Sequence, residues 1–179
     1  QLNCSQAFCR MLSTNQARIS PNERRMLVSA YQSELFNRYL EARMRDALVD
    51  RALAGDVLKK SDTGGLFTVD DTPAALADAA ERLRTRAVVV TGPMFGHKMM
   101  SPPAGTPSRA REDALLAEEG IDADSFKVLG KLAEGTRRPL LVPVAGAQVR
   151  AGDAPDTLVL DFALPPGAYA TVLLAEVTK

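Results

Sequence analysis

The chain has 179 residues, of which 46% are hydrophobic and 25% are charged, with 22 basic and 22 acidic side chains. This composition is typical of a soluble globular protein with one domain, or one domain and a smaller appendage. A net charge of zero gives no indication of nucleic-acid binding, because a free-standing RNA-binding domain is usually basic. No apolar run approaches the length of a membrane span and no leader is visible, so we expect no membrane partner.

Metal ligands are scarce. The only histidine is His97, and the two cysteines are Cys4 and Cys9. One histidine and two distant thiols cannot complete a structural zinc site, so we expect no metal. We interpret both cysteines as reduced cytosolic thiols, with a disulfide between them as the alternative.

The first strong local signal is the segment Ser20–Glu23, which has the pattern of a capping box with Pro21 at the first helical position. Apolar residues then recur at helical spacing. They are Leu27, Tyr31, Leu35, Phe36, Tyr39, Leu40, Met44 and Leu48. The pattern predicts a long amphipathic helix, bent once, that ends near Gly55.

The middle of the chain alternates between strand and helix patterns. Residues 56–60 and 66–69 flank a Ser-Asp-Thr-Gly-Gly turn and predict a β-hairpin. A helix is predicted from Thr72 through Leu83, followed by a buried strand over 87–90. The Gly- and Pro-rich stretch 94–108 predicts a long surface loop.

The last third changes from helix to strand patterns. Helices are predicted over 109–119 and from Asp122 to near Gly135. Strands are predicted over 140–144, 147–150 and 157–164, and a short terminal helix over 169–177. The predicted fold class is α+β.

Several candidate sites are weak. The stretch Gly92–Lys98 differs from a phosphate-binding loop in its spacing, so we reject a nucleotide site there. His97 has no Ser or Cys pattern around it and is better interpreted as a loop histidine than as a general base. The carboxylates Asp70, Asp71, Asp122 and Asp124 could suggest acid–base pairs or a metal, but helix capping explains Asp71 and Asp122 better.

Three pairs of arginines stand out: Arg24-Arg25, Arg43-Arg45 and Arg137-Arg138. Each pair could simply lie on a solvated face. The alternative is contact with phosphates, which a guanidinium can bind through two hydrogen bonds. We expect Phe36 and Tyr39 in the core rather than stacked on RNA bases.

Five segments then occur in the order that is typical of one family. They are Ser29–Asn37, Gly55–Leu58, Thr91–Gly96, Arg137–Pro139, and Leu164–Thr171 followed by Glu176. Together they resemble the tRNA pseudouridine synthase D (TruD) family over nearly the whole chain from Ser20 onward.

The resemblance implies a catalytic domain with a mixed sheet, interrupted by an inserted α/β TRUD domain. Residues 24–144 look like the insertion, while 1–23 and 145–179 look like pieces of the catalytic domain. The family isomerises a specific uridine, uridine-13, of certain tRNAs by breaking the glycosidic bond and rejoining the base through carbon. The resemblance implies no cofactor, tRNA as the partner, a cytoplasmic location and a monomer.

The family's catalytic aspartate belongs to a Gly-x-Lys-Asp segment, and its active-site Asn and aromatic belong to an Asn-x-Phe segment. Both are expected before Gln1, so we assign no catalytic residue and expect this stretch to be an inactive fragment. Two departures from the family pattern bear on activity. Ala168 replaces the usual Ser, and Ala175 stands where an Arg is common.

A base inside folded tRNA must be flipped out before its glycosidic carbon can react, at a cost of roughly a few kcal/mol. An inserted domain facing the catalytic sheet would grip the tRNA backbone and offset that cost. The candidate RNA contacts are Arg24, Lys98, Arg137 and Arg138. The alternative hypothesis is a non-catalytic RNA-binding or assembly module of the same fold, and a less favoured one is a small-molecule enzyme centred on the 94–108 loop.

Overall fold

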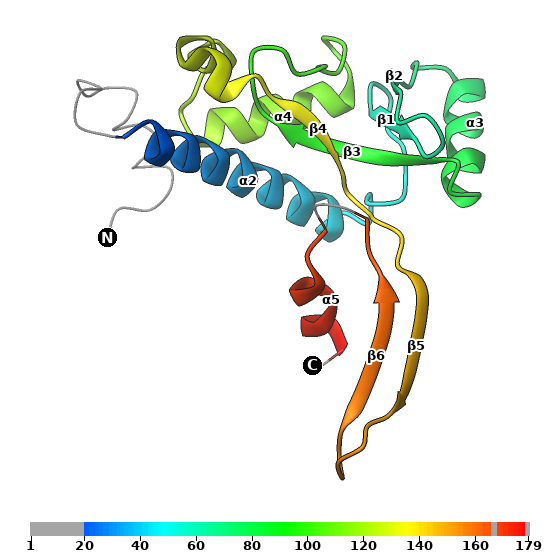
Figure 1. Cartoon of the computed structure of the whole chain (residues 1–179). Coiled ribbons are helices and arrows are strands. Elements are labelled where there is room, and N and C mark those ends of the chain that lie inside the picture. Colours follow the sequence, from blue (N-terminus) through cyan, green and yellow to red (C-terminus); the bar gives the residue numbers. More distant parts are fainter. Residues whose placement is uncertain (1–19, 166–167, 178–179) are drawn as a thin grey trace. The chain divides into compact units, whose positions relative to one another are not determined.

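The computed structural model describes residues 20–165 and 168–177, which divide into two compact units (Figure 1). Unit 1 extends to Leu140 and is described from residue 20. Unit 2 begins at Leu141. Cys4 and Cys9 lie outside the described residues.

Unit 1 opens with the helix α2, Pro21–Arg45. The predicted capping box is confirmed, because the Ser20 hydroxyl accepts from the Glu23 amide and the Glu23 carboxylate accepts from the Ser20 amide. Most of its apolar stripe is buried or half-buried, and the predicted core positions Phe36 and Tyr39 are 5% and 3% exposed, but Met44 is 62% exposed. This helix packs on the central strand of the sheet (Figure 1).

The sheet of unit 1 has four antiparallel strands in the order β2-β1-β3-β4. The strands are β1 (Val57–Lys60), β2 (Leu66–Thr68), β3 (Val88–Met94) and β4 (Thr136–Pro139). The predicted hairpin is confirmed as β1 and β2, with Leu58 opposite Phe67. Strand β3 is longer than predicted, because its pairing with β4 continues from Thr91 to Met94.

Three further helical segments complete unit 1. They are α3 (Pro73–Arg84), α4 (Pro107–Glu118) and the 3₁₀ segment η2 (Ala123–Ala133). The threonines before Pro73 and Pro107 are the N-caps of α3 and α4. In η2, Gly130 has φ of 52°, which interrupts the predicted helix. None of the helices in the described residues is long and apolar enough to span a membrane.

The predicted end of the first helix near Gly55 is wrong. The helix ends at Arg45, and Ala47 follows with φ of 54°, a left-handed conformation that stops helical hydrogen bonding. Arg43 stabilises this early end, because its guanidinium donates to the carbonyl oxygens of Leu48 and Arg51 at 2.7–2.9 Å. The chain therefore turns around the Arg43 side chain instead of continuing as a helix.

The predicted strand over 140–144 is also wrong. Strand β4 lies earlier, at Thr136–Pro139, where its residues pair with β3. Residues 141–144 form no strand. Pro143 has no backbone N–H, so it cannot donate a hydrogen bond to a neighbouring strand.

Unit 2 contains a β-hairpin and one helix. Strands β5 (Ala145–Ala151) and β6 (Leu158–Ala163) are antiparallel, and α5 covers Ala170–Val177. The predicted strand over 157–164 is confirmed as β6, but several of the unit's apolar side chains are exposed in this structure. Leu158 is 69% exposed, Val149 on β5 is 64% exposed and Val172 on α5 is 64% exposed.

Candidate functional site

The loop between α2 and β1 closes around Asp56, whose side chain is fully buried. Its two carboxylate oxygens each lie 2.9 Å from a guanidinium nitrogen of Arg43. The Ser108 hydroxyl, at the start of α4, donates to the same carboxylate at 2.7 Å. Burial lowers the pKa of Arg43, but the hydrogen bonds and charge of Asp56 outweigh it, so the pKa is raised overall. The segment Gly55–Leu58 is therefore a structural junction of α2, β1 and α4.

Arg137 occupies a second buried site. Its guanidinium lies 2.7 Å from Glu112 of α4 and donates to the hydroxyl and carbonyl oxygens of Thr91 on β3. Arg137 is 5% exposed and Glu112 is 2% exposed. Burial raises the pKa of the Glu112 carboxyl, while the charge of Arg137 opposes that shift. Because this guanidinium is buried and bonded, we do not retain Arg137 as a phosphate contact.

Two glycines beside this network permit close packing, one against backbone and one against side chains. A Cβ on Gly96 would lie 2.2 Å from the backbone nitrogen of Gly135. One on Gly92 would lie 2.9 Å from the side chains of Phe36 and Leu140. The segment Thr91–Gly96 therefore needs glycine for packing, not for cradling a phosphate.

The other predicted RNA contacts lie at the surface or are half-buried. Arg24 is half-buried in the first turn of α2. The Lys98 ammonium is exposed and lies 2.6 Å from a Glu134 carboxylate oxygen. The guanidinium carbon of Arg138 lies 5.2 Å from the centre of the Phe36 ring, and no carboxylate in the described part of the chain pairs with it. Within the described residues, the ion pair of Lys98 and the ring contact of Arg138 are with other residues, so the structure does not define Arg24, Lys98 and Arg138 as one cluster.

The weak candidates have structural roles. The Nδ1 atom of His97 lies 3.1 Å from the carbonyl oxygen of Ala133, so the ring belongs to a loop contact. Asp122 caps η2 through the Asp124 amide, as predicted. The cap of α3 is Thr72 rather than Asp71, so that prediction is wrong. Among residues 20–165 and 168–177, no group of His, Cys, Asp or Glu side chains is arranged to hold a metal ion.

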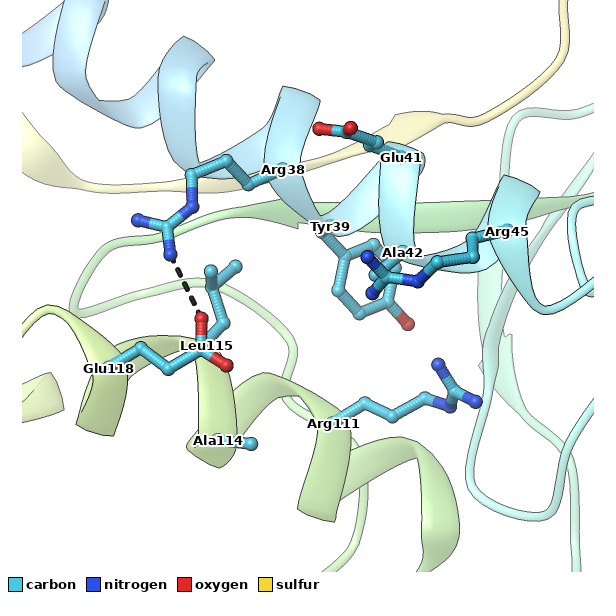
Figure 2. A pocket seen from close by; sticks show the side chains of 9 residues that line it. All are labelled: Arg38, Tyr39, Glu41, Ala42, Arg45, Arg111, Ala114, Leu115 and Glu118. Atoms are coloured by element: carbon cyan, nitrogen blue, oxygen red, sulfur yellow. Dashed lines mark hydrogen bonds and ion pairs between the residues drawn. The ribbon is translucent and has the colours of Figure 1, made fainter.

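A hollow of about 350 Å³ lies between α2 and α4, which we call the α2–α4 hollow (Figure 2). Three arginines line it, but acidic groups oppose two of them. Figure 2 shows Arg38 of α2 pointing toward Glu118 of α4, with 2.9 Å between the paired atoms. Arg38 also pairs with Glu119, and Arg111 lies 2.6 Å from Asp46. The cations of this hollow are largely neutralised by the protein itself.

A second hollow of about 780 Å³ lies between the N-terminal half of α2 and η2, which we call the α2–η2 hollow. Arg25 and Ser29 are on its α2 side, and Lys131 is on its η2 side. The predicted RNA contacts include Arg24 but neither its neighbour Arg25 nor Lys131. Helical phase was the signal available for Arg25, since it lies outside the buried stripe of α2. No sequence signal connects Arg25 with Lys131, because tertiary packing brings them to one hollow.

A sequence model of the family described as tRNA pseudouridine synthase D (TruD) matches residues 11–177. The chain belongs to the TruD family. The tRNA pseudouridine synthase D of Anaeromyxobacter sp. (strain Fw109-5) is 47% identical over 156 residues, which cover 87% of this chain and 42% of that protein. The protein of the same name from Thermus thermophilus is 40% identical over 170 residues, covering 95% of this chain and 44% of that protein.

A solved structure agrees with this assignment. The crystal structure of the putative TruD of Methanosarcina mazei superposes with a TM-score of 0.69 at 27% identity, covering 85% of this chain and 37% of that one. The predicted α+β class and the predicted family are confirmed. The chain spans less than half the length of these TruD relatives.

Proposed function

We propose that this chain is part of a tRNA pseudouridine synthase that isomerises uridine-13 of tRNA, and that its own contribution is to grip the tRNA. The match to the TruD family over residues 11–177 is the observation that carries this proposal. The curated relatives are named as tRNA pseudouridine synthases, and the chain corresponds to less than half of each. The nucleophilic aspartate belongs to the remainder of the protein, so the 179-residue chain is inactive alone.

Within this chain, residues 24–144 form the inserted domain, and residues 1–23 and 145–179 belong to the catalytic domain. Two observations support this division. The compact unit 1 ends at Leu140, close to the proposed boundary. Unit 2 exposes apolar side chains on both strands and on its helix, which suits a hairpin that continues a larger sheet. The protein acts as a monomer in the cytoplasm, without a cofactor.

The grip uses Arg24, Lys98 and Arg138. Arg138 is the strongest of these, because stacking on Phe36 holds its guanidinium in place while its edge remains available for phosphate oxygens. Lys98 must exchange Glu134 for a phosphate, which makes its contribution smaller.

The experiment is a site-resolved assay of pseudouridine in an unmodified tRNA transcript. The full-length protein is expected to convert the uridine at position 13, and the 179-residue chain assayed beside it is expected to convert none. Failure of the full-length protein to modify any tRNA would refute the enzymatic proposal and favour a non-catalytic RNA-binding module. Conversion by the 179-residue chain would refute the assignment of the nucleophile to the remainder of the protein.

A further inference from the structure

The charge of the α2–η2 hollow differs from that of the rest of the molecule. The chain as a whole is neutral. None of the described residues that line this hollow is acidic, yet Arg25 and Lys131 both line it. Both side chains are exposed, and neither forms an ion pair within the described part of the chain. The Glu134 carboxylate forms its ion pair with Lys98, whose hydrogen bond lowers its pKa, and the charge of Lys131 is near enough to help lower that pKa. Arg25 and Lys131 therefore line this hollow without a carboxylate bound to either of them.

The α2–α4 hollow is a useful contrast within the same unit. It has more arginines, but Arg38 pairs with Glu118 and Glu119, and Arg111 pairs with Asp46. An incoming anion would have to break those ion pairs before it could bind. In the α2–η2 hollow an anion has only to displace water. Of the two basic hollows, the α2–η2 hollow is therefore the better site for a polyanion.

Uncharged hydrogen-bonding groups lie beside the two cations. Ser29 and Ser33 are four residues apart and therefore share one face of α2, and both line the hollow. Serine inside a helix commonly bonds to a backbone carbonyl of the preceding turn. Neither hydroxyl makes a hydrogen bond within the described residues, so both are available to an external acceptor.

The wall behind these serines is held in place. Gln32 also lines the hollow, and its side-chain amide donates to the carbonyl oxygen of Phe95 at 2.6 Å. Gln32 is 8% exposed, so it contributes little polar surface of its own. Met26 and Leu132 supply apolar surface at the same hollow. The result is a fixed surface with cations, hydroxyl groups and apolar carbon close together.

We propose that the α2–η2 hollow holds a stretch of tRNA sugar–phosphate backbone, with Arg25 and Lys131 on phosphate oxygens and Ser29 and Ser33 donating to the backbone. Arg and Lys side chains with Ser hydroxyls are the usual protein donors to nucleic-acid phosphates. The ribose carbons pack on Met26 and Leu132. This inference rests on the proposed function, and it adds a contact surface outside the residues Arg24, Lys98 and Arg138.

The test uses the full-length protein and compares the double variant R25A/K131A with the wild type. Equilibrium binding to one tRNA transcript is measured at several salt concentrations. Each lost phosphate contact is expected to lower the slope of log affinity against log salt by roughly 0.7–0.9, and the double variant therefore by roughly 1.4–1.8. The affinity at low salt is expected to fall by about tenfold or more.

Two matched variants separate a local contact from a general change in charge. K60A/R84A removes the same two charges from β1 and α3, which lie away from the N-terminal half of α2 (Figure 1), and is expected to leave the slope unchanged. R25K/K131R keeps both charges in the hollow and is expected to keep the wild-type slope. A thermal unfolding curve for each variant checks that the fold is intact.

The outcomes distinguish this inference from the proposed function. A wild type that neither binds nor modifies tRNA overturns the proposed function and this inference with it. A wild type that modifies tRNA, with R25A/K131A equal to K60A/R84A in affinity and slope, overturns this inference alone. In that case an acidic protein partner becomes the better candidate for the hollow.

Discussion

Unit 1 and unit 2 differ in what happens to their apolar and charged side chains. Unit 1 buries a continuous core around α2 and β3 and seals two ion pairs inside it, Arg43–Asp56 and Arg137–Glu112. Unit 2 has two strands and one helix, and its apolar residues Val149, Leu158 and Val172 are each more than 60% exposed. An isolated two-stranded hairpin is marginally stable at best in water.

This contrast indicates which part of the chain can fold by itself. Unit 1 has the layers and the satisfied polar groups of an independent domain. The exposed apolar side chains of unit 2 suit contact with a further part of the protein. The chain spans less than half the length of its TruD relatives. This difference is what we expect if unit 2 belongs to a larger catalytic domain and unit 1 is an inserted domain, as we propose.

The largest effect is expected from the buried pair in unit 1. Asp56→Ala leaves the Arg43 guanidinium buried without its carboxylate, and should lower the free energy of unfolding by about 3–5 kcal/mol. Urea denaturation of the 179-residue chain measures this. The matched control is Asp78→Ala, which breaks an exposed pair with Arg82 and should change stability by less than about 1 kcal/mol. Equal effects of the two substitutions would contradict a sealed core.

The next effect comes from the backbone contact between Gly96 and Gly135. Gly96→Ala places a methyl group against backbone that cannot move aside, and should destabilise unit 1 by about 1–3 kcal/mol. Gly65→Ala is the matched control, because its nearest neighbour is at 3.5 Å, an ordinary van der Waals distance. Thermal unfolding followed by circular dichroism compares them, and a Gly96→Ala curve that matches the control would be evidence against the close packing.

A smaller and gradual effect is expected from pH. Burial raises the pKa of Glu112 above its ordinary value of 4.5, so the folded state binds the proton more tightly than the unfolded state. This contribution to stability is fully present below pH 4.5 and is lost as the pH rises through the raised pKa. The stability of the wild type relative to Glu112→Gln should therefore increase as the pH is lowered through that window. A difference that stays constant or shrinks on acidification would show that the charge of Arg137 dominates instead.

The smallest effect is expected in unit 2. Leu158 is 69% exposed, so Leu158→Ser should change the unfolding of the 179-residue chain by no more than about 0.5 kcal/mol. The same substitution in the full-length protein should be clearly more destabilising, because we propose that the rest of the catalytic domain covers this strand. Equally small effects in both proteins would show that Leu158 stays exposed and would remove that support for the domain division.

The sequence predicted the elements whose causes are local. The start of α2 follows from Ser20 and Glu23, which lie three residues apart, and the β1–β2 hairpin follows from a Gly-Gly turn between two strands. The end of α2 could not be predicted in this way. The helix stops because the Arg43 side chain binds carbonyl oxygens beyond it and the Asp56 carboxylate just before β1, and these contacts exist only in the folded state.

The candidate site shows the same limit. Arg137 has the pattern of a phosphate ligand in the sequence, but Glu112 meets it from another element and holds it inside. Arg25 and Lys131 have no common pattern, yet folding brings both to the α2–η2 hollow. Whether an arginine is buried or exposed depends on the acidic partner that folding brings to it. That partner is often distant in the sequence, so a single sequence does not reveal it.

We propose that unit 1 is a self-supporting domain that grips tRNA. The most direct measurement is binding of a labelled tRNA transcript by residues 20–140 alone, after cooperative unfolding has shown that the piece is folded. We expect binding that weakens steeply with added salt and is reduced in R25A/K131A. A folded piece that binds no tRNA even at low salt would contradict it.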